Sequence, residues 1–271
     1  MLTLIRSLST FGFHDILMWT MKKLNVIVPI YNVENYLKPC LDSLLAQTYL
    51  DFSVSLVNDG TQDSSRRIAQ TYVDKYPDLF NLMDKENGGL SDARNYGLDK
   101  SSAEYVSFID ADDYIHPTMF EKMMRLFDEH IDVVACDMIY VYPDGRSEIS
   151  SAGKDSLLDE QYGYMLLNNS ACNKIYRRSL FVSERFIKGR WYEDLATIPC
   201  VLSKAKGIRL IHEGLYYYVQ RDGSIAHTQN PKMFDIYWAI QHIENQLMLK
   251  DTAWMRVKSD LILNHGLFLT G

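Results

Sequence analysis

The sequence has few cysteines, and none of them lies at a spacing typical of a metal or redox site. Its four cysteines are Cys40, Cys136, Cys172 and Cys200, without a C-x-x-C pair. A disulfide scaffold and a zinc site built on cysteines are therefore excluded. The spacing predicts reduced and mostly buried thiols in a cytoplasmic protein.

Positive charge and long apolar runs are also scarce. The chain has 28 Lys and Arg against 35 Asp and Glu, a formal net charge of −7, which gives no support to a nucleic-acid partner. No window approaches the roughly 18 uninterrupted apolar residues of a membrane span. Residues 1–20 lack the small-residue cleavage site of a signal peptide. Two readings of them stay open: a leader preceding Met21, or a peripheral amphipathic anchor at the inner face of the membrane.

What the sequence does contain is a regular alternation of short apolar runs and helical periodicity. Hydrophobic residues make up 47% of the chain, ordinary for a globular protein. The first half predicts strands at 24–30, 52–57, 79–83 and 105–109, with helices between them over 37–45, about 65–73 and 90–98. This order predicts an α/β fold with a mixed, mostly parallel sheet flanked by helices.

The second half is less regular. It predicts strands at 131–141 and 208–219 and helices at 195–205 and 236–247. The hydrophilic stretch 143–155 is expected to be a loop or a boundary between subregions.

Polar residues follow three of the predicted strands directly. Tyr31 and Asn32 follow the first, residues 58–61 the second, and residues 110–113 the fourth. In open α/β sheets, ligands bind beyond the carboxyl ends of the strands, so these positions are expected to meet at a binding site. A plain turn explains each cluster taken alone, since Asn, Asp and Gly are favoured in turns.

Taken together, the clusters form an ordered set of motifs. In chain order these are V-I-V-P-I-Y-N, V-N-D-G-T-x-D-S, N-G-G-L-S-x-A-R-N, D-A-D-D and W-Y-E-D. The set resembles family 2 glycosyltransferases, inverting nucleotide-sugar enzymes with a GT-A fold, from about residue 24 to about 224. It departs at Asn58, where the family more often has aspartate. The resemblance implies a catalytic domain over 21–230, with a nucleotide-binding half (21–115) and an acceptor-binding half (116–230). A helical C-terminal extension over 231–271 follows.

The acidic turn after the fourth predicted strand suits a divalent cation. Mn²⁺ and Mg²⁺ prefer oxygen ligands, and on phosphates one or two carboxylates suffice because the diphosphate and water supply the rest. The resemblance implies that Asp112 is the direct ligand and that Asp110 contacts the ribose or the metal shell. His227 is a further candidate ligand or a contact to the diphosphate. The alternative is that the acidic turn only caps the helix expected after Pro117.

The resemblance also implies how the donor is held. Pro29, Tyr31 and Asn32 line the base pocket, and Asp59 accepts a hydrogen bond from uracil. Gly88 and Gly89 allow backbone amides to come close to a sugar or phosphate. Arg94 can pair with the acidic turn or with the diphosphate. The expected nucleotide-binding residues are Pro29, Tyr31, Asn32, Asp59, Gly88, Gly89, Arg94, Asp110, Ala111 and Asp112.

The family places its general base in the E-D pair, here Glu193 and Asp194. An inverting transfer needs one base to take the proton of the acceptor hydroxyl. We expect Asp194 to be the base, with Glu193 as the second choice or an acceptor contact. The alternative is a purely structural preference for acids at a helix N-terminus. The expected contacts to the acceptor or the diphosphate are Asn173, Lys174, Trp191, Arg221 and Ser224.

The sequence thus predicts an inverting transferase that moves a hexose or N-acetylhexosamine from a UDP-sugar to a glycan or lipid-linked glycan, with Mn²⁺ or Mg²⁺. The resemblance further suggests bacterial polysaccharide synthesis, with peripheral membrane association and a homo-oligomer left open. The first alternative is a non-catalytic nucleotide-sugar-binding or partner subunit. A sugar-1-phosphate nucleotidyltransferase would need a Gly-rich, basic loop after the first strand, where Tyr31-Asn32-Val33-Glu34 stands. A glycoside hydrolase would need a facing carboxylate pair.

Overall fold

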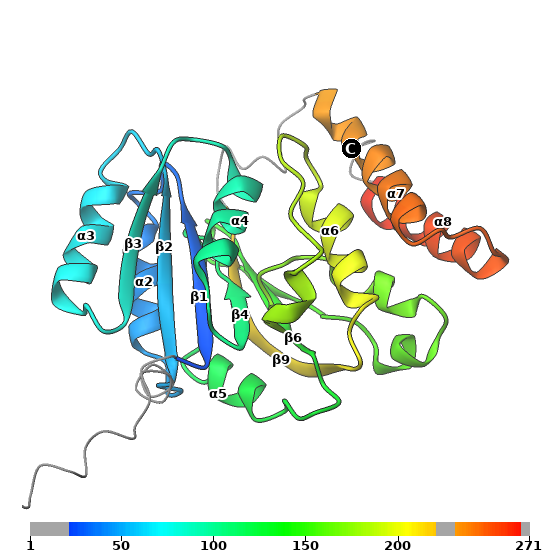
Figure 1. Cartoon of the computed structure of the whole chain (residues 1–271), viewed down its shortest axis with the longest axis horizontal. Helices are drawn as coiled ribbons and strands as arrows, with labels where there is room; N and C mark the ends of the chain where they lie inside the picture. The colour runs from blue at the N-terminus through cyan, green and yellow to red at the C-terminus, as the bar shows by residue number, and fades with distance from the viewer. Residues whose placement is uncertain (1–21, 221–230, 267–271) are drawn as a thin grey trace, which may run out of the picture.

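The chain folds around one large mixed sheet with helices on both faces (Figure 1). The computed structural model describes residues 22–220 and 231–266, and over these residues nine strands form the sheet. The strands are β1 (Leu24–Ile30), β2 (Phe52–Asp59), β3 (Phe80–Lys85), β4 (Tyr105–Phe108), β5 (Tyr114–Ile115), β6 (Val133–Val141), β7 (Ser147–Ser150), β8 (Lys174–Arg177) and β9 (Ile208–Val219). The α-helices are α2 (Leu37–Leu45), α3 (Ser65–Lys75), α4 (Leu90–Lys100), α5 (Met119–Met124), α6 (Glu193–Leu202), α7 (Asp235–Gln246) and α8 (Thr252–Gly266). The predicted α/β class is confirmed.

The first four strands form the parallel part of the sheet, in the order β3-β2-β1-β4. β1 lies in the middle and is buried along its whole length, as expected of an apolar run covered on both faces. The strand order reverses between β2 and β4 around β1. Such a switch point opens a crevice at the carboxyl ends of the strands.

Helix α4 approaches β1 unusually closely. A Cβ added at Gly97 would lie 2.5 Å from Cγ2 of Ile27, which no real side chain tolerates. Glycine at this position therefore lets the helix pack directly on the strand. Because Arg94 precedes Gly97 by nearly one turn, the close packing also sets how deeply Arg94 enters the sheet edge.

The second part of the sheet is mostly antiparallel. β8 pairs antiparallel with both β4 and β6, and β9 runs parallel to β6. The register sets Ile175 opposite Ser107, so the start of β8 lies beside the end of β4. Residues just before β8 are thereby brought to the acidic turn that follows β4.

The helices α7 and α8 pack against α6 through a second apolar cluster (Figure 1). Ala196 of α6, Ile240 of α7 and Trp254, near the start of α8, are buried in it. The helix predicted for 236–247 is confirmed as α7, and it shares a core with the helix that begins at Glu193. No helix among the described residues is long and apolar enough to cross a bilayer. The predicted leader, residues 1–20, lies outside the described range.

One expectation from the sequence was wrong in part. The stretch 143–155 contains a strand, β7, which pairs antiparallel with β6. It was missed because β7 is a short edge strand whose residues are largely exposed, so it carries no apolar alternation. The four-residue strand β8 was also not predicted from the sequence.

Candidate active site

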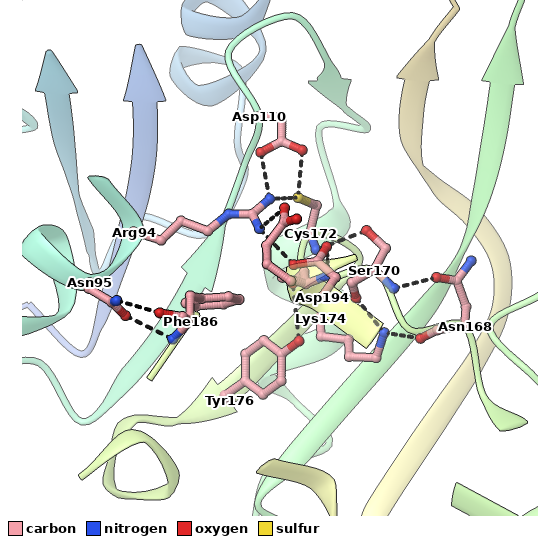
Figure 2. Close-up of polar contacts among 12 residues, drawn as sticks. Arg94, Asn95, Asp110, Asn168, Ser170, Cys172, Lys174, Tyr176, Phe186 and Asp194 are labelled. Carbon is pink, nitrogen blue, oxygen red and sulfur yellow. Dashed lines mark hydrogen bonds and ion pairs between the residues drawn. The ribbon is translucent and has the colours of Figure 1, made fainter. Parts of the chain in front are cut away.

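A buried arginine lies at the centre of the site (Figure 2). Arg94 of α4 is 1% exposed, and its Nη2 donates to Asp110 Oδ1 at 2.9 Å, just after β4. Its Nη1 donates to Asp194 Oδ1 at 2.6 Å and lies 3.6 Å from Glu193 Oε1. Burial opposes the charge, but Asp194 and Asp110 keep the pKa of Arg94 well above its ordinary value. One guanidinium therefore joins the acidic turn to the E-D pair.

A thiol holds the other side of Asp110. Cys172 Sγ donates to Asp110 Oδ2 at 3.1 Å and also lies 3.5 Å from Arg94 Nη2. Burial raises the pKa of Cys172 well above its ordinary value, so the sulfur keeps its proton and remains a donor. Both oxygens of Asp110 are thus held by neighbours.

A buried lysine braces the loop that carries Cys172. Lys174 Nζ donates to Asn168 O at 2.5 Å and to Ser170 O at 2.7 Å (Figure 2). It also donates to Asn173 Oδ1 at 2.7 Å. These three bonds use every proton of its ammonium. In the same loop, the amide of Ala171 donates to Asp194 Oδ2 at 3.0 Å. The loop therefore touches both Asp110 and Asp194.

The predicted acceptor contacts Asn173 and Lys174 do not reach a binding surface. Both side chains are 0% exposed, and Asn173 Nδ2 donates to Cys136 O at 2.6 Å. Burial lowers the pKa of Lys174 to about 8. The prediction is corrected because every donor of Lys174 is already used inside the protein.

The E-D pair opens α6, as predicted. Tyr192, which precedes it, has a left-handed backbone with φ 60°, rare for a bulky side chain. Burial and the neighbouring Asp194 raise the pKa of Glu193 to about 7, and burial also raises the pKa of Asp194. A carboxyl group with a pKa near neutrality suits proton transfer at physiological pH.

The acidic turn itself divides into two kinds of aspartate. Asp113 is buried and accepts from Tyr216 Oη at 2.6 Å and from the Val219 amide at 2.8 Å, so it ties the turn to β9. Burial and the charges of Asp110 and Asp112 raise the pKa of Asp113 well above its ordinary value. Asp112 is half-buried, and Ala111 is buried between it and Asp110.

Asp110 and Asp112 supply part of the oxygen ligands that a hard divalent cation requires. No group of three or more His, Cys, Asp or Glu poised around a metal occurs within the described residues. An ion carried by a diphosphate needs only one or two carboxylates, and Asp112 with Asp110 supplies oxygen donors of that kind. His227, the third predicted ligand, lies outside the described residues, as do Arg221 and Ser224.

The predicted base pocket is arranged around the end of β1. Tyr31 is 48% exposed, whereas Pro29 is buried within the strand. Asn32 has a positive φ of 52°, and its Oδ1 accepts from the amide of Gln62 at 2.8 Å. This bond holds the turn after β1 against the turn after β2.

Asp59 and the glycine pair bind each other. Asp59 Oδ1 accepts from the Gly88 amide at 2.9 Å, and Oδ2 accepts from the Gly89 amide at 2.8 Å. Lys85 Nζ pairs with the same carboxylate, whose side chain is 2% exposed. The two amides predicted to face the donor are therefore engaged by Asp59.

Several residues of the site were missed from the sequence. Lys85 was not among the predicted site residues, and Cys172 was predicted only as a buried thiol, although Lys85 binds Asp59 and Cys172 binds Asp110. Asp235 was not noticed, yet it accepts from the amide of Trp191 at 3.1 Å. The one local signal for Cys172 is its position directly before Asn173 and Lys174.

A mixed sheet with this order and an acidic turn after β4 defines the GT-A fold. Residues 1–349 of Staphylococcus aureus TarS, solved with UDP-GlcNAc, are 27% identical with a TM-score of 0.75, covering 90% of this chain and 72% of that one. The model of glycosyl transferase family 2 matches residues 25–183, more than half of the sequence. The chain therefore belongs to glycosyl transferase family 2.

Curated relatives agree on the family and differ in length. The glycosyltransferase GlyG of Streptococcus pneumoniae is 30% identical over 236 residues, covering 82% of this chain and 77% of GlyG. The minor teichoic acid biosynthesis protein GgaB of Bacillus subtilis is 34% identical over 213 residues, covering 74% of this chain but only 23% of GgaB. The chain thus spans about a quarter of one relative and about three quarters of the other.

Proposed function

We propose that the protein is an inverting glycosyltransferase that moves a hexose or N-acetylhexosamine from a UDP-sugar to a hydroxyl of a glycan or lipid-linked glycan. The observation that carries this proposal is the bridge from Arg94 to Asp110 and Asp194, at 2.9 and 2.6 Å. In this proposal the bridge would hold the diphosphate end of the donor next to the base. The UDP-GlcNAc and UDP complexes of TarS support a uridine donor.

Each side chain has a separate proposed task. Asp112 would hold Mn²⁺ or Mg²⁺ with help from Asp110, and such an ion neutralises the charge of a departing diphosphate. Asp194, oriented by Arg94 and the Ala171 amide, takes the proton of the acceptor hydroxyl. Tyr31 offers an exposed ring against which a base can stack.

The experiment is a thermal-shift panel of UDP-, GDP- and dTDP-sugars, each with and without Mn²⁺. We expect the largest stabilisation from a UDP-sugar with metal, because a ligand stabilises the fold in proportion to the logarithm of its concentration over its Kd. Asp112→Asn should remove the metal-dependent part of the shift. Glu121→Gln, a control at a partly exposed carboxylate of α5, should not. A GDP-sugar giving the largest shift would contradict the uridine assignment.

Product analysis separates the remaining classes. Free UDP with an inverted glycosidic bond is expected, whereas pyrophosphate would indicate a nucleotidyltransferase. Binding of UDP without any turnover by the wild type would indicate a non-catalytic nucleotide-sugar-binding subunit.

A further inference from the structure

The segment directly before the E-D pair is attached to α7, outside the part of the chain matched by the family model. Arg190 Nη1 lies 2.8 Å from Asp235 Oδ1, and the Trp191 amide donates to Asp235 Oδ2 at 3.1 Å. Each oxygen of the Asp235 carboxylate thus holds one of two consecutive residues. Asp235 is the first residue of α7 and is 9% exposed.

Two further contacts tie the same segment to the C-terminal helices. The guanidinium of Arg190 lies over the ring of Trp238, 5.1 Å from its centroid. Tyr192 packs against the apolar cluster shared by α6, α7 and α8. Three consecutive residues, 190–192, therefore contact α7 or its core before α6 begins.

The attachment of residues 190–192 to α7 affects how Glu193 and Asp194 are oriented. Tyr192 keeps a left-handed backbone that a bulky residue adopts only when its surroundings enforce it. The turn at Tyr192 sets the direction in which α6 starts, and with it the direction of both carboxylates. Misplacing a catalytic group by about 1 Å can cost about a hundredfold in rate.

We propose that Asp235 is a positioning residue for the catalytic pair, and that α7 thereby completes the acceptor half of the site. This inference rests on the proposed transferase function. An acid in the first turn of a helix is also favoured by the helix dipole alone. The two bonds to Arg190 and Trp191 go beyond that preference, because they leave the helix and reach the segment before α6.

The test compares Asp235→Ala and Asp235→Asn with Asp251→Ala in the full chain. Asp251 is the control: it accepts from the Trp254 amide at 2.8 Å and from Tyr162 Oη and Gln161 Nε2 at 3.0 Å, and none of these partners belongs to residues 190–194. The measurements are the Kd of UDP by calorimetry, UDP release from UDP-hexoses and UDP-N-acetylhexosamines at saturating donor, and the melting temperature.

We expect Asp235→Ala to slow UDP release by about tenfold or more, with the Kd of UDP within about twofold of wild type. The rate of UDP release by Asp235→Asn should lie between those of the wild type and Asp235→Ala, because an amide oxygen can still accept from the Trp191 amide. Asp251→Ala should lower the melting temperature by a similar amount and keep the rate. An equal slowing in Asp235→Ala and Asp251→Ala would overturn the proposal.

A readout independent of turnover is tryptic cleavage after Arg190, followed by mass spectrometry. Losing Asp235 should release the segment and speed this cleavage relative to both wild type and Asp251→Ala; unchanged cleavage would count against the proposal. A wild type that binds no UDP would overturn the transferase function itself. Wild-type turnover that survives Asp235→Ala would overturn only the role of Asp235.

Discussion

Arg94 Nη1 lies 2.6 Å from Asp194 Oδ1 although 100 positions separate the two residues. The bond connects α4, which packs on the parallel strands, with α6, which packs on the C-terminal helices. Both side chains are mostly buried, so water screens the interaction weakly. This pair directly links the predicted donor and acceptor halves of the site.

Removing Arg94 should destabilise the protein strongly. Arg94→Met leaves Asp110 and Asp194 without their shared cation in a buried place, which we expect to cost about 3–5 kcal/mol in urea denaturation. Arg66 pairs with Asp84 at an exposed position, and Arg66→Met should cost less than about 1 kcal/mol. If both variants lost the same free energy of unfolding, the buried bridge would contribute no more to stability than an exposed ion pair.

Asp194→Asn and Glu193→Gln should separate the base from its neighbour. If Asp194 takes the proton, Asp194→Asn lowers turnover by about a hundredfold or more while UDP still binds. Glu193→Gln should have a smaller effect. Steady-state rates with the donor found by thermal shift, together with the Kd of UDP, make the comparison. The reverse order of effects would assign the base to Glu193.

The raised pKa of Glu193 predicts a pH dependence of stability. Its folded value of about 7 lies above the ordinary value of 4.5, so the protonated form is favoured in the folded state. The stability that it contributes is present below about pH 4.5 and is lost as the pH rises to about 7. At about 1.4 kcal/mol per pKa unit, the loss is at most about 3.5 kcal/mol. Glu193→Gln should remove this slope, measured as the free energy of unfolding from pH 4.5 to 8; an unchanged slope would contradict the assignment.

Lys174 should be needed for folding and not for contact with the acceptor. Lys174→Met removes the donor for Asn168 O and Ser170 O, and each buried oxygen left without a partner costs about 1–3 kcal/mol. Lys204, exposed beside Glu184, provides the control, and Lys204→Met should cost less than about 1 kcal/mol. The melting temperatures of the two variants test this prediction. A Lys174→Met protein with normal stability and weakened acceptor binding would restore the original prediction.

The parallel part of the fold was predictable because its signals are local. The run 24–30 is apolar throughout, and the stripe of α2 repeats at helical spacing, so each element could be recognised without its neighbours. Strand β8 has four residues, too short to show a period. Its place between β4 and β6 is set by pairing alone.

The sequence singled out Arg94, Asp110 and Asp194 as separate candidates, and the structure brings them into contact. The sequence predicted that Arg94 could pair with the acidic turn, and its bond to Asp110 confirms this. Nothing local indicated that the same guanidinium would also bind Asp194. Asp59 illustrates the opposite error. Its carboxylate was expected to face a ligand, whereas a buried acid takes the nearest available donors, here the amides of Gly88 and Gly89.

Gly97 fixes the spacing between α4 and β1, and that spacing restricts which residues can replace it. With Ile27 in its way, even a methyl group would push α4 outward and withdraw the guanidinium three residues earlier from both of its carboxylates. The smallest side chain in the protein thus decides whether two distant acids can share one charge. A larger residue at position 97 would therefore require Ile27 to shift or to be replaced by a shorter side chain.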